Sequence, residues 1–209
     1  MSDAPNRSVD AIRDAIAARA DRPLVVALDG RSGAGKSTLA RLLLTSVDAA
    51  LVEADLFYRD MPDDQRAALT PEDGVAMYFD WERLRDEALI PLRQGGTAQF
   101  CPFDWQQGSG LASPVTVEHR PLVIVEGVYS ARPEFDGLVH LRVLIEVDEH
   151  QRQGRLRKRI HDLAEWTTRW EAAEDVYFRR IRPPASFHLR VRGDWEAPPP
   201  SPCAGSCST

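Results

Sequence analysis

Short apolar runs alternate along this chain with longer stretches in which apolar residues recur at helical spacing. Strands are predicted at 24–28, 51–54, 115–117, 122–125, 141–147 and 187–191, and helices at 8–20, 39–44, 81–93, 151–161 and 165–181. Ser8 precedes the first apolar helical positions and is the predicted N-cap. The run at 122–125 is apolar on both faces, which is typical of a central parallel strand. This alternation predicts an α/β fold in which helices wrap a parallel sheet.

Chain length and C-terminal composition set the expected domain organisation. A chain of 209 residues suits one globular domain, which we expect to span residues 1–196. Pro, Gly, Ser and Cys dominate residues 197–209, and a segment of this composition cannot bury enough apolar area to fold. We therefore expect a disordered tail at 197–209.

The net charge and the hydropathy of the chain limit the classes of partner that it is expected to bind. The net charge of −6 argues against nucleic acid as a partner. No apolar run approaches the roughly 20 residues of a membrane helix, and residues 1–7 lack the apolar core of a signal peptide. The cysteines at 101, 203 and 207 lack the spacing of a zinc site. We expect a soluble, cytoplasmic protein that does not bind a membrane. The sequence is compatible with a homo-oligomer.

The segment after the first predicted strand carries the strongest chemical signal. Residues 30–38 read GRSGAGKST and match the phosphate-binding pattern G-x-x-x-x-G-K-[ST] between a strand and a helix. Backbone N–H groups at such a helix start point at one anion, and glycine lets the backbone approach it closely. Lys36 is expected to contact the β- and γ-phosphates, and Ser37 to bind Mg²⁺. The expected nucleotide-binding residues are Gly30, Ser32, Gly33, Ala34, Gly35, Lys36, Ser37 and Thr38.

A P-loop occurs in kinases, GTPases and ATPases, so other residues must separate these classes. A GTPase carries N-K-x-D and D-x-x-G, whereas this chain has neither and its single asparagine is Asn6. No segment is similar to the L-S-G-G-Q motif of transport ATPases, and the chain is too short for a motor ATPase. Of these classes, a small phosphotransferase remains.

The structural alternative to a nucleotide site is that residues 30–38 form a Gly-rich turn before an ordinary helix.

Four further segments follow the P-loop in a fixed order. They are Asp55-Leu56-Phe57-Tyr58, Phe79-Asp80-Trp81, Cys101-Pro102-Phe103-Asp104-Trp105 and Val125-Glu126-Gly127-Val128-Tyr129. In this order they resemble the D-x-F-Y, D-W, P-x-Y-D-F and V-E-G-I-Y segments of the uridine kinase and phosphoribulokinase-like P-loop kinases. The resemblance covers about residues 22–192. It implies a P-loop NTPase-type three-layer sandwich with ATP and Mg²⁺ as cofactors.

The resemblance also implies which residues face the phosphate acceptor. Asp55 follows a strand that we expect beside the first, where ligands bind in open α/β sheets. The family uses this position to orient or deprotonate the acceptor hydroxyl, and the alternative is a capping role. Asp80 matches the family's sugar-hydroxyl ligand, and Tyr58 and Phe103 are expected on the acceptor side. Uridine kinases carry a base-contacting tyrosine and histidine where this chain has Phe103 and Gly108, which weakens the case for uridine.

A basic segment at about 150–165 is expected to form a short helical, arginine-rich lid. At helical spacing Arg155, Lys158 and Arg159 share one side, and guanidinium groups pair bidentately with phosphate oxygens. The segment resembles the family's lid, which implies that Arg155 and Arg159 contact phosphate or adenine and act in catalysis with Lys36 and Asp55. Arg157 is expected to be solvated. The alternative is an electrostatic patch without a catalytic role.

A carboxylate ends the strand that we expect to pair with the first. The resemblance implies that Glu126 holds Mg²⁺ together with Ser37, because the family uses a carboxylate here. The alternative is that Glu126 is a buried partner of Lys36.

The sequence as a whole predicts an ATP- and Mg²⁺-dependent kinase that phosphorylates a hydroxyl group of a small metabolite, with a nucleoside as the first choice. A sugar, a pantothenate-like compound and a nucleoside monophosphate are alternative acceptors. From a different class, the alternative is a nucleotide-binding ATPase that switches a partner. An acidic acceptor site and an arginine-rich lid favour the kinase, since a hydrolase gains nothing from an acceptor pocket.

Overall fold

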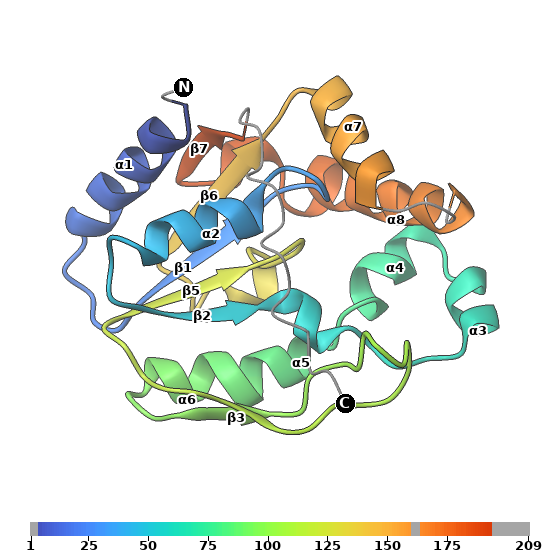
Figure 1. Ribbon diagram of the computed structural model, residues 1–209, viewed down its shortest axis with the longest axis horizontal. Helices are drawn as coiled ribbons and strands as arrows, with labels where there is room; N and C mark the ends of the chain where they lie inside the picture. Colours follow the sequence, from blue (N-terminus) through green and yellow to red (C-terminus); the bar gives the residue numbers. More distant parts are fainter. Residues whose placement is uncertain (1–3, 160–163, 194–209) are drawn as a thin grey trace, which may run out of the picture.

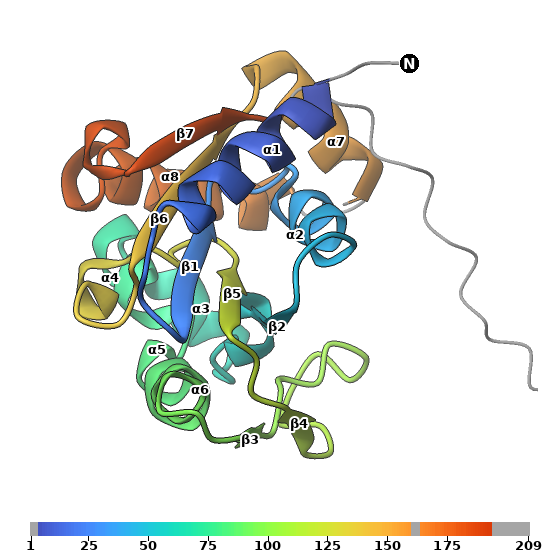
Figure 2. The same ribbon diagram turned by 90° about the vertical axis from the view of Figure 1, so that its left-hand side faces the viewer.

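Five parallel strands form the central sheet of the protein. The computed structural model describes residues 4–159 and 164–193. In spatial order, the strands are β2 (Ala49–Glu53), β5 (Leu122–Glu126), β1 (Leu24–Asp29), β6 (Leu141–Glu146) and β7 (Leu189–Arg192). Helices cover both faces of this sheet (Figure 1, Figure 2). The α/β fold expected from the sequence, a helix-wrapped parallel sheet in three layers, is confirmed.

Side chains of β1 alternate between two hydrophobic cores, as the twofold period of a strand requires. Leu24, Val26 and Leu28 pack with residues of α1 (Ala4–Ala17) and α2 (Lys36–Leu44). Val25 and Ala27 face the opposite core, and all five side chains are fully buried. That second core contains residues of α4 (Pro71–Met77), α8 (Ala164–Val176) and the helical segment 81–93.

The helical segment 81–93 is continuous, as predicted, and consists of α5 (Trp81–Arg83), a π-helical turn (Leu84–Leu89) and α6 (Ile90–Arg93). The remaining helices are α3 (Asp63–Ala68), α7 (Glu149–Arg159), a π-helical turn at Tyr177–Ile181 and 3₁₀ turns at Ala54–Phe57, Pro133–Phe135 and Pro184–Ser186. The strand predicted at 115–117 exists as β4 (Val115–Val117). It pairs antiparallel with β3 (Ala98–Phe100) in a separate two-stranded sheet.

Four local expectations are wrong. Ser8 does not cap the first helix, because α1 begins earlier, at Ala4, and the Ser8 hydroxyl instead donates to the carbonyl of Arg192 at 2.9 Å. This helix also ends at Ala17 rather than near residue 20, and the last strand starts at Leu189 rather than 187. Strand β2 is not beside β1, because β5 lies between them.

Some expectations fall beyond the described residues. The end of the domain at 196 and the tail at 197–209 lie outside them. Helix α7 covers the first part of the expected lid, and residues 160–163 of that lid are outside the described part. Within residues 4–159 and 164–193, no helix has the length and apolar character needed to cross a bilayer.

Candidate active site

The P-loop joins β1 to α2. Gly30 has a φ of 152°, and a Cβ there would lie 2.5 Å from the Ile145 carbonyl oxygen, so only glycine fits. Gly35 precedes α2 in the left-handed conformation with a φ of 97°. The Lys36 ammonium donates to the carbonyls of Gly30 and Arg31 at 2.9 and 3.2 Å. These contacts hold the loop in a compact curve around the start of the helix.

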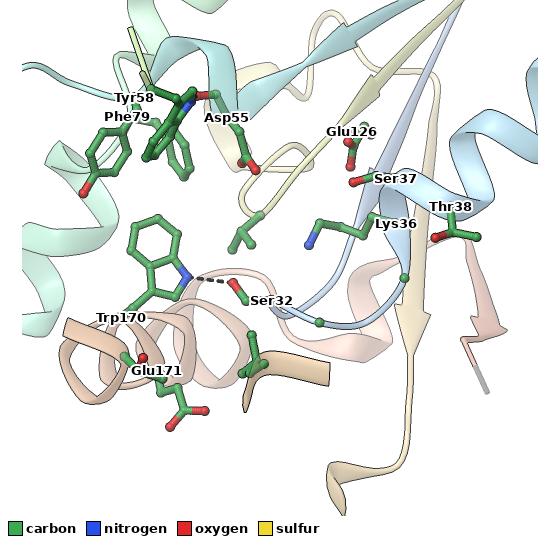
Figure 3. Close-up of a pocket in the computed structure, with 16 residues that line it drawn as sticks. Ser32, Lys36, Ser37, Thr38, Asp55, Tyr58, Phe79, Glu126, Trp170 and Glu171 are labelled. Carbon is green, nitrogen blue, oxygen red and sulfur yellow. Dashed lines mark hydrogen bonds between the residues drawn. The ribbon is translucent and has the colours of Figure 1, made fainter. Parts of the chain in front are cut away.

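A cavity of about 220 Å³ opens beside the P-loop, and Figure 3 shows the side chains around it. Its lining comprises Ser32, Gly33, Gly35, Lys36, Ser37, Thr38, Asp55, Tyr58, Phe79, Trp105, Glu126, Val128, Leu156, Thr167, Trp170 and Glu171. Six of the expected P-loop residues therefore line the same cavity as Asp55, Tyr58 and Glu126. One cavity thus contains the expected phosphate site and part of the expected acceptor site.

Two carboxylates approach the P-loop from the carboxyl ends of neighbouring strands. Glu126 ends β5, which pairs with β1 as expected, while Asp55 lies in the turn that follows β2. Figure 3 shows Asp55, Glu126, Ser37 and Lys36 directed toward the same region. Glu126 is only 4% exposed, and burial raises the pKa of its carboxyl to about 7, with Lys36 opposing and Asp55 adding to this rise. The Glu126 carboxylate is therefore poorly solvated and suited to binding a cation.

Ser37 and Glu126 form a donor set that fits Mg²⁺. The Ser37 hydroxyl and the Glu126 carboxylate lie close to each other beside the Lys36 side chain (Figure 3), and Ser37 partly offsets the rise in the pKa of Glu126. These are the hard oxygen ligands that Mg²⁺ prefers. The described residues contain no group of three or more His, Cys, Asp or Glu that could hold a metal on their own. A Mg²⁺ ion here would take further ligands from nucleotide phosphates and water.

Aromatic side chains form the wall opposite the P-loop. The Tyr58 ring lies 4.9 Å from Trp105 and 5.8 Å from Phe79, and the Trp170 ring lies 5.5 Å from Phe79, measured between centroids. Trp105 is 52% exposed, and its indole N–H donates to the backbone carbonyl of Asp55 at 3.1 Å. The loop that carries Trp105 is thus tied to the loop that carries Asp55.

Asp29, at the end of β1, holds the loops beneath the cavity. Its buried carboxylate accepts hydrogen bonds from the N–H groups of Gly30, Tyr129 and Ala131 at 2.7 to 3.1 Å and from the Tyr177 hydroxyl at 2.7 Å. Burial raises the pKa of Asp29 to about 6, against the lowering effect of these bonds. The residue links the start of the P-loop to the loop after β5 and to the helical segment after α8.

Several expected site residues lie away from the cavity wall. Asp80 accepts from the Arg83 N–H at the start of α5 and lies 3.5 Å from the Arg59 guanidinium. Phe103 is buried and packs edge-on against Tyr58 with centroids 5.2 Å apart. Arg155 donates to the carbonyls of Gly33 and Gly193 at 3.1 and 2.7 Å, so it contacts the P-loop backbone.

Two expected P-loop residues also lie away from the cavity wall. Gly30 and Ala34 belong to the P-loop without lining the cavity, and Ala34 is buried beneath it. Arg159 ends α7, and its side chain lies outside the described part of the chain. Arg157 is exposed, as expected.

The sequence did not indicate the contribution of α8 to the cavity. Trp170, Glu171 and Thr167 all line it, and Phe79 joins them from the segment before α5. In the sequence, Trp170 is one apolar position in a helical stripe and is indistinguishable from a core residue.

Comparisons with known proteins find relatives by sequence and by fold. No model of a protein family matches the chain. A curated uridine kinase from Deinococcus deserti is 28% identical over 167 residues, which cover 78% of this chain and 79% of the relative. A solved structure described as a possible uridine kinase from Bacillus stearothermophilus superposes with a TM-score of 0.69 at 19% identity, covering 89% of this chain and 98% of that one.

A second solved structure, a candidate fructose transport system kinase from Silicibacter sp. TM1040, superposes with a TM-score of 0.68 at 22% identity. It covers 91% of this chain and 98% of that chain. Similarity of sequence and similarity of fold thus point to the same group. The resemblance of this chain to the uridine kinase-like P-loop kinases is confirmed.

Proposed function

We propose that this protein transfers the γ-phosphoryl group of ATP to a hydroxyl group of a small metabolite, with a nucleoside as the first choice. The observation that carries the proposal is the shared cavity, in which the P-loop faces Asp55 and an aromatic wall. Phosphoryl transfer needs little covalent chemistry from the protein. It needs alignment of the acceptor with the phosphate, neutralised charge and exclusion of water.

Each side chain around the cavity has a distinct part in this reaction. Lys36 neutralises charge on the β- and γ-phosphates, and the P-loop N–H groups fix their position. Asp55 orients the acceptor hydroxyl or takes its proton as the phosphoryl group leaves ATP. Ser37 and Glu126 would hold Mg²⁺, which would supply positive charge to neutralise the phosphates. The aromatic wall excludes water on the acceptor side.

The aromatic wall supports a flat or partly apolar acceptor. Phe79, Trp105 and Trp170 line the cavity together with Tyr58, and a nucleobase stacks on such rings for about 1–3 kcal/mol. A sugar acceptor is the second candidate, because one structural neighbour is named a fructose transport system kinase and sugars also pack on aromatic faces. A pantothenate-like compound and a nucleoside monophosphate stay alternatives.

A screen of acceptors in the presence of MgATP tests the proposal. Nucleosides and sugars are offered one at a time, and ADP formation is measured with and without each compound. We expect at least one to stimulate ADP formation and to appear as a phosphorylated product. Acceptor-independent hydrolysis that no compound stimulates would instead support the ATPase switch.

The variant Lys36→Ala supplies the matching control for the nucleotide site. We expect a folded protein whose turnover is lower by at least about a hundredfold, because a phosphate clamp missing from the transition state costs several kcal/mol. Arg41→Ala, at an exposed position of the same helix, should retain wild-type turnover. Near-wild-type phosphorylation by Lys36→Ala would refute the assignment of the P-loop.

A further inference from the structure

A buried carboxylate from α8 lies directly behind the P-loop. The Glu174 side chain is fully buried. One of its oxygens, Oε1, accepts from the Ser32 N–H at 2.9 Å, the Ser32 hydroxyl at 2.6 Å and the Trp170 indole N–H at 2.8 Å. A single carboxylate oxygen therefore joins a P-loop residue to a residue of the cavity wall.

Trp170 is part of the aromatic wall of the cavity. Its indole stacks on Tyr78 with centroids 4.9 Å apart and planes at 21°, and it meets Phe79 edge-on. The indole N–H also contacts the Ser32 hydroxyl at 2.8 Å, as the dashed line in Figure 3 shows. Any shift of Ser32 thus alters the hydrogen bonds of a ring that lines the cavity.

The second oxygen of Glu174 makes this arrangement sensitive to charge. Oε2 is buried and has no hydrogen-bond partner among the described residues. The Arg31 and Arg152 guanidinium groups lie 3.8 and 4.0 Å from it, which is beyond hydrogen-bond distance. Arg31 is itself a P-loop residue, and Arg152 donates to the carbonyl of Ser32 at 3.3 Å. Of the two cations that balance Glu174, Arg31 therefore belongs to the P-loop and Arg152 is hydrogen-bonded to it.

We propose that Glu174 is a positioning residue that couples nucleotide binding at the P-loop to the acceptor wall through Trp170. Backbone N–H groups of a P-loop bind phosphate, so a bound nucleotide redirects or tightens the loop that contains Ser32. Ser32 and Trp170 both donate hydrogen bonds to Oε1 of Glu174. A change that orders Ser32 therefore also orders Trp170. Such coupling is reciprocal, so an acceptor seated against Trp170 raises nucleotide affinity by the same factor. The inference rests on the proposed function only for the identity of the acceptor.

Tryptophan emission during titration with MgADP tests this coupling without an acceptor. The chain has five tryptophans, so the response of Trp170 is obtained as the difference between the wild-type protein and Trp170→Phe. We expect a saturable difference signal, while equilibrium dialysis shows that Trp170→Phe still binds MgADP. Equal emission changes in the two proteins would overturn the proposal.

Glu174→Gln tests whether the carboxylate carries the coupling, since glutamine keeps the size but loses the charge. We expect the Trp170 signal to disappear and MgADP affinity to fall by about fivefold or more, the lower end of a typical coupling. The matched control is Glu72→Gln, which removes an exposed carboxylate whose partner, Arg180, is also exposed. It should keep the Trp170 signal, because exposed ion pairs contribute little. A wild-type signal in Glu174→Gln would overturn the proposal.

A second variant tests the coupling if the first one does not fold. If Glu174→Gln shows no cooperative unfolding, Ser32→Ala replaces it, because it removes one of the three donors to the same oxygen. A full Trp170 signal in Ser32→Ala would then contradict the coupling.

Two outcomes separate this inference from the proposed function. MgADP binding without any Trp170 response refutes this inference and leaves the kinase proposal intact. A Trp170 response in a protein that phosphorylates no acceptor refutes the kinase proposal alone.

Discussion

At the scale of single residues, Tyr129 shows how the loop after β5 is held. It adopts a φ of 68°, which is uncommon for a residue with a side chain. The N–H groups of Tyr129 and Ala131 both donate to Asp29, and these bonds hold the unfavourable conformation. The Tyr129 ring packs edge-on against Tyr177 at 4.7 Å. Its buried hydroxyl has no hydrogen-bond partner among the described residues.

Tyr129→Phe should therefore leave stability unchanged or raise it by about 1 kcal/mol, because it removes a buried polar group that makes no hydrogen bond. Urea unfolding measures this free energy. The control is Tyr177→Phe, which removes the hydroxyl that donates to Asp29 at 2.7 Å and should cost about 1–3 kcal/mol. Equal losses in the two variants would contradict this account of the loop.

Glu126 gives the protein a pH dependence of known sign. The pKa of its carboxyl is raised from 4.5 to about 7 in the folded state, mainly by burial. Between these values the folded protein holds a proton that the unfolded chain has released. In metal-free buffer, this group therefore lowers the free energy of unfolding as pH rises from 4.5 to about 7, by up to about 3 kcal/mol.

Urea unfolding at several pH values across this window measures the effect. Glu126→Gln has no carboxyl to titrate, so the wild-type protein should lose stability relative to this variant as pH rises. Parallel pH profiles for the two proteins would show that Glu126 titrates at its ordinary pKa.

At the scale of elements, Arg152 fastens α7 to α8 and to the P-loop. The side chain is 4% exposed and donates to Glu149 and Glu171 at 2.7 to 2.8 Å, as well as to the Ser32 carbonyl. The expected lid therefore begins with a helix that is anchored at its first turn. Arg155, one turn further along α7, adds hydrogen bonds to the carbonyls of Gly33 and Gly193.

Arg152→Met should destabilise the protein by about 2 kcal/mol or more, because it leaves carboxylates behind the P-loop without their cation. The expected cost is at the low end for a buried ion pair, since Glu149 and Glu171 are partly exposed. Arg157→Met on the same helix is the control, and its exposed position should change stability by less than about 0.5 kcal/mol. Thermal or urea unfolding of both variants checks this, and equal effects would contradict the anchoring role.

The sequence predicts elements that depend on local pattern and misses contacts made by the fold. The strands at 24–28 and 122–125 are predictable from the sequence, because a short run that is apolar on both faces is typical of a central parallel strand. The P-loop was clear because its motif is local. The place of β2 beside β5 was not predictable from pattern, since strand order depends on the crossover connections. Trp170 looked like a core residue because helical periodicity does not distinguish a core from a cavity wall.

At the scale of the whole molecule, strand order arranges the cavity. The strands β2, β5 and β1 are adjacent and parallel, so their carboxyl ends meet at one edge of the sheet. Glu126 on the middle strand therefore lies between Asp55 and the P-loop. This order places the expected metal ligand between the acceptor side and the nucleotide side. Helix α8 closes the cavity with Trp170 and Glu171.

Transfer of a radiolabelled γ-phosphate by the wild-type protein and by Asp55→Asn tests this arrangement most directly. Both proteins are incubated with labelled MgATP and the acceptor that stimulates ADP formation, and the labelled metabolite and free phosphate are quantified. We predict that the wild-type protein labels the metabolite and that Asp55→Asn does so about 10²- to 10⁴-fold more slowly, the range for a positioned base. MgADP affinity should change little. Equal rates of labelling, or equal release of free phosphate by both proteins with no label in any metabolite, would contradict the assignment of Asp55 to the acceptor side.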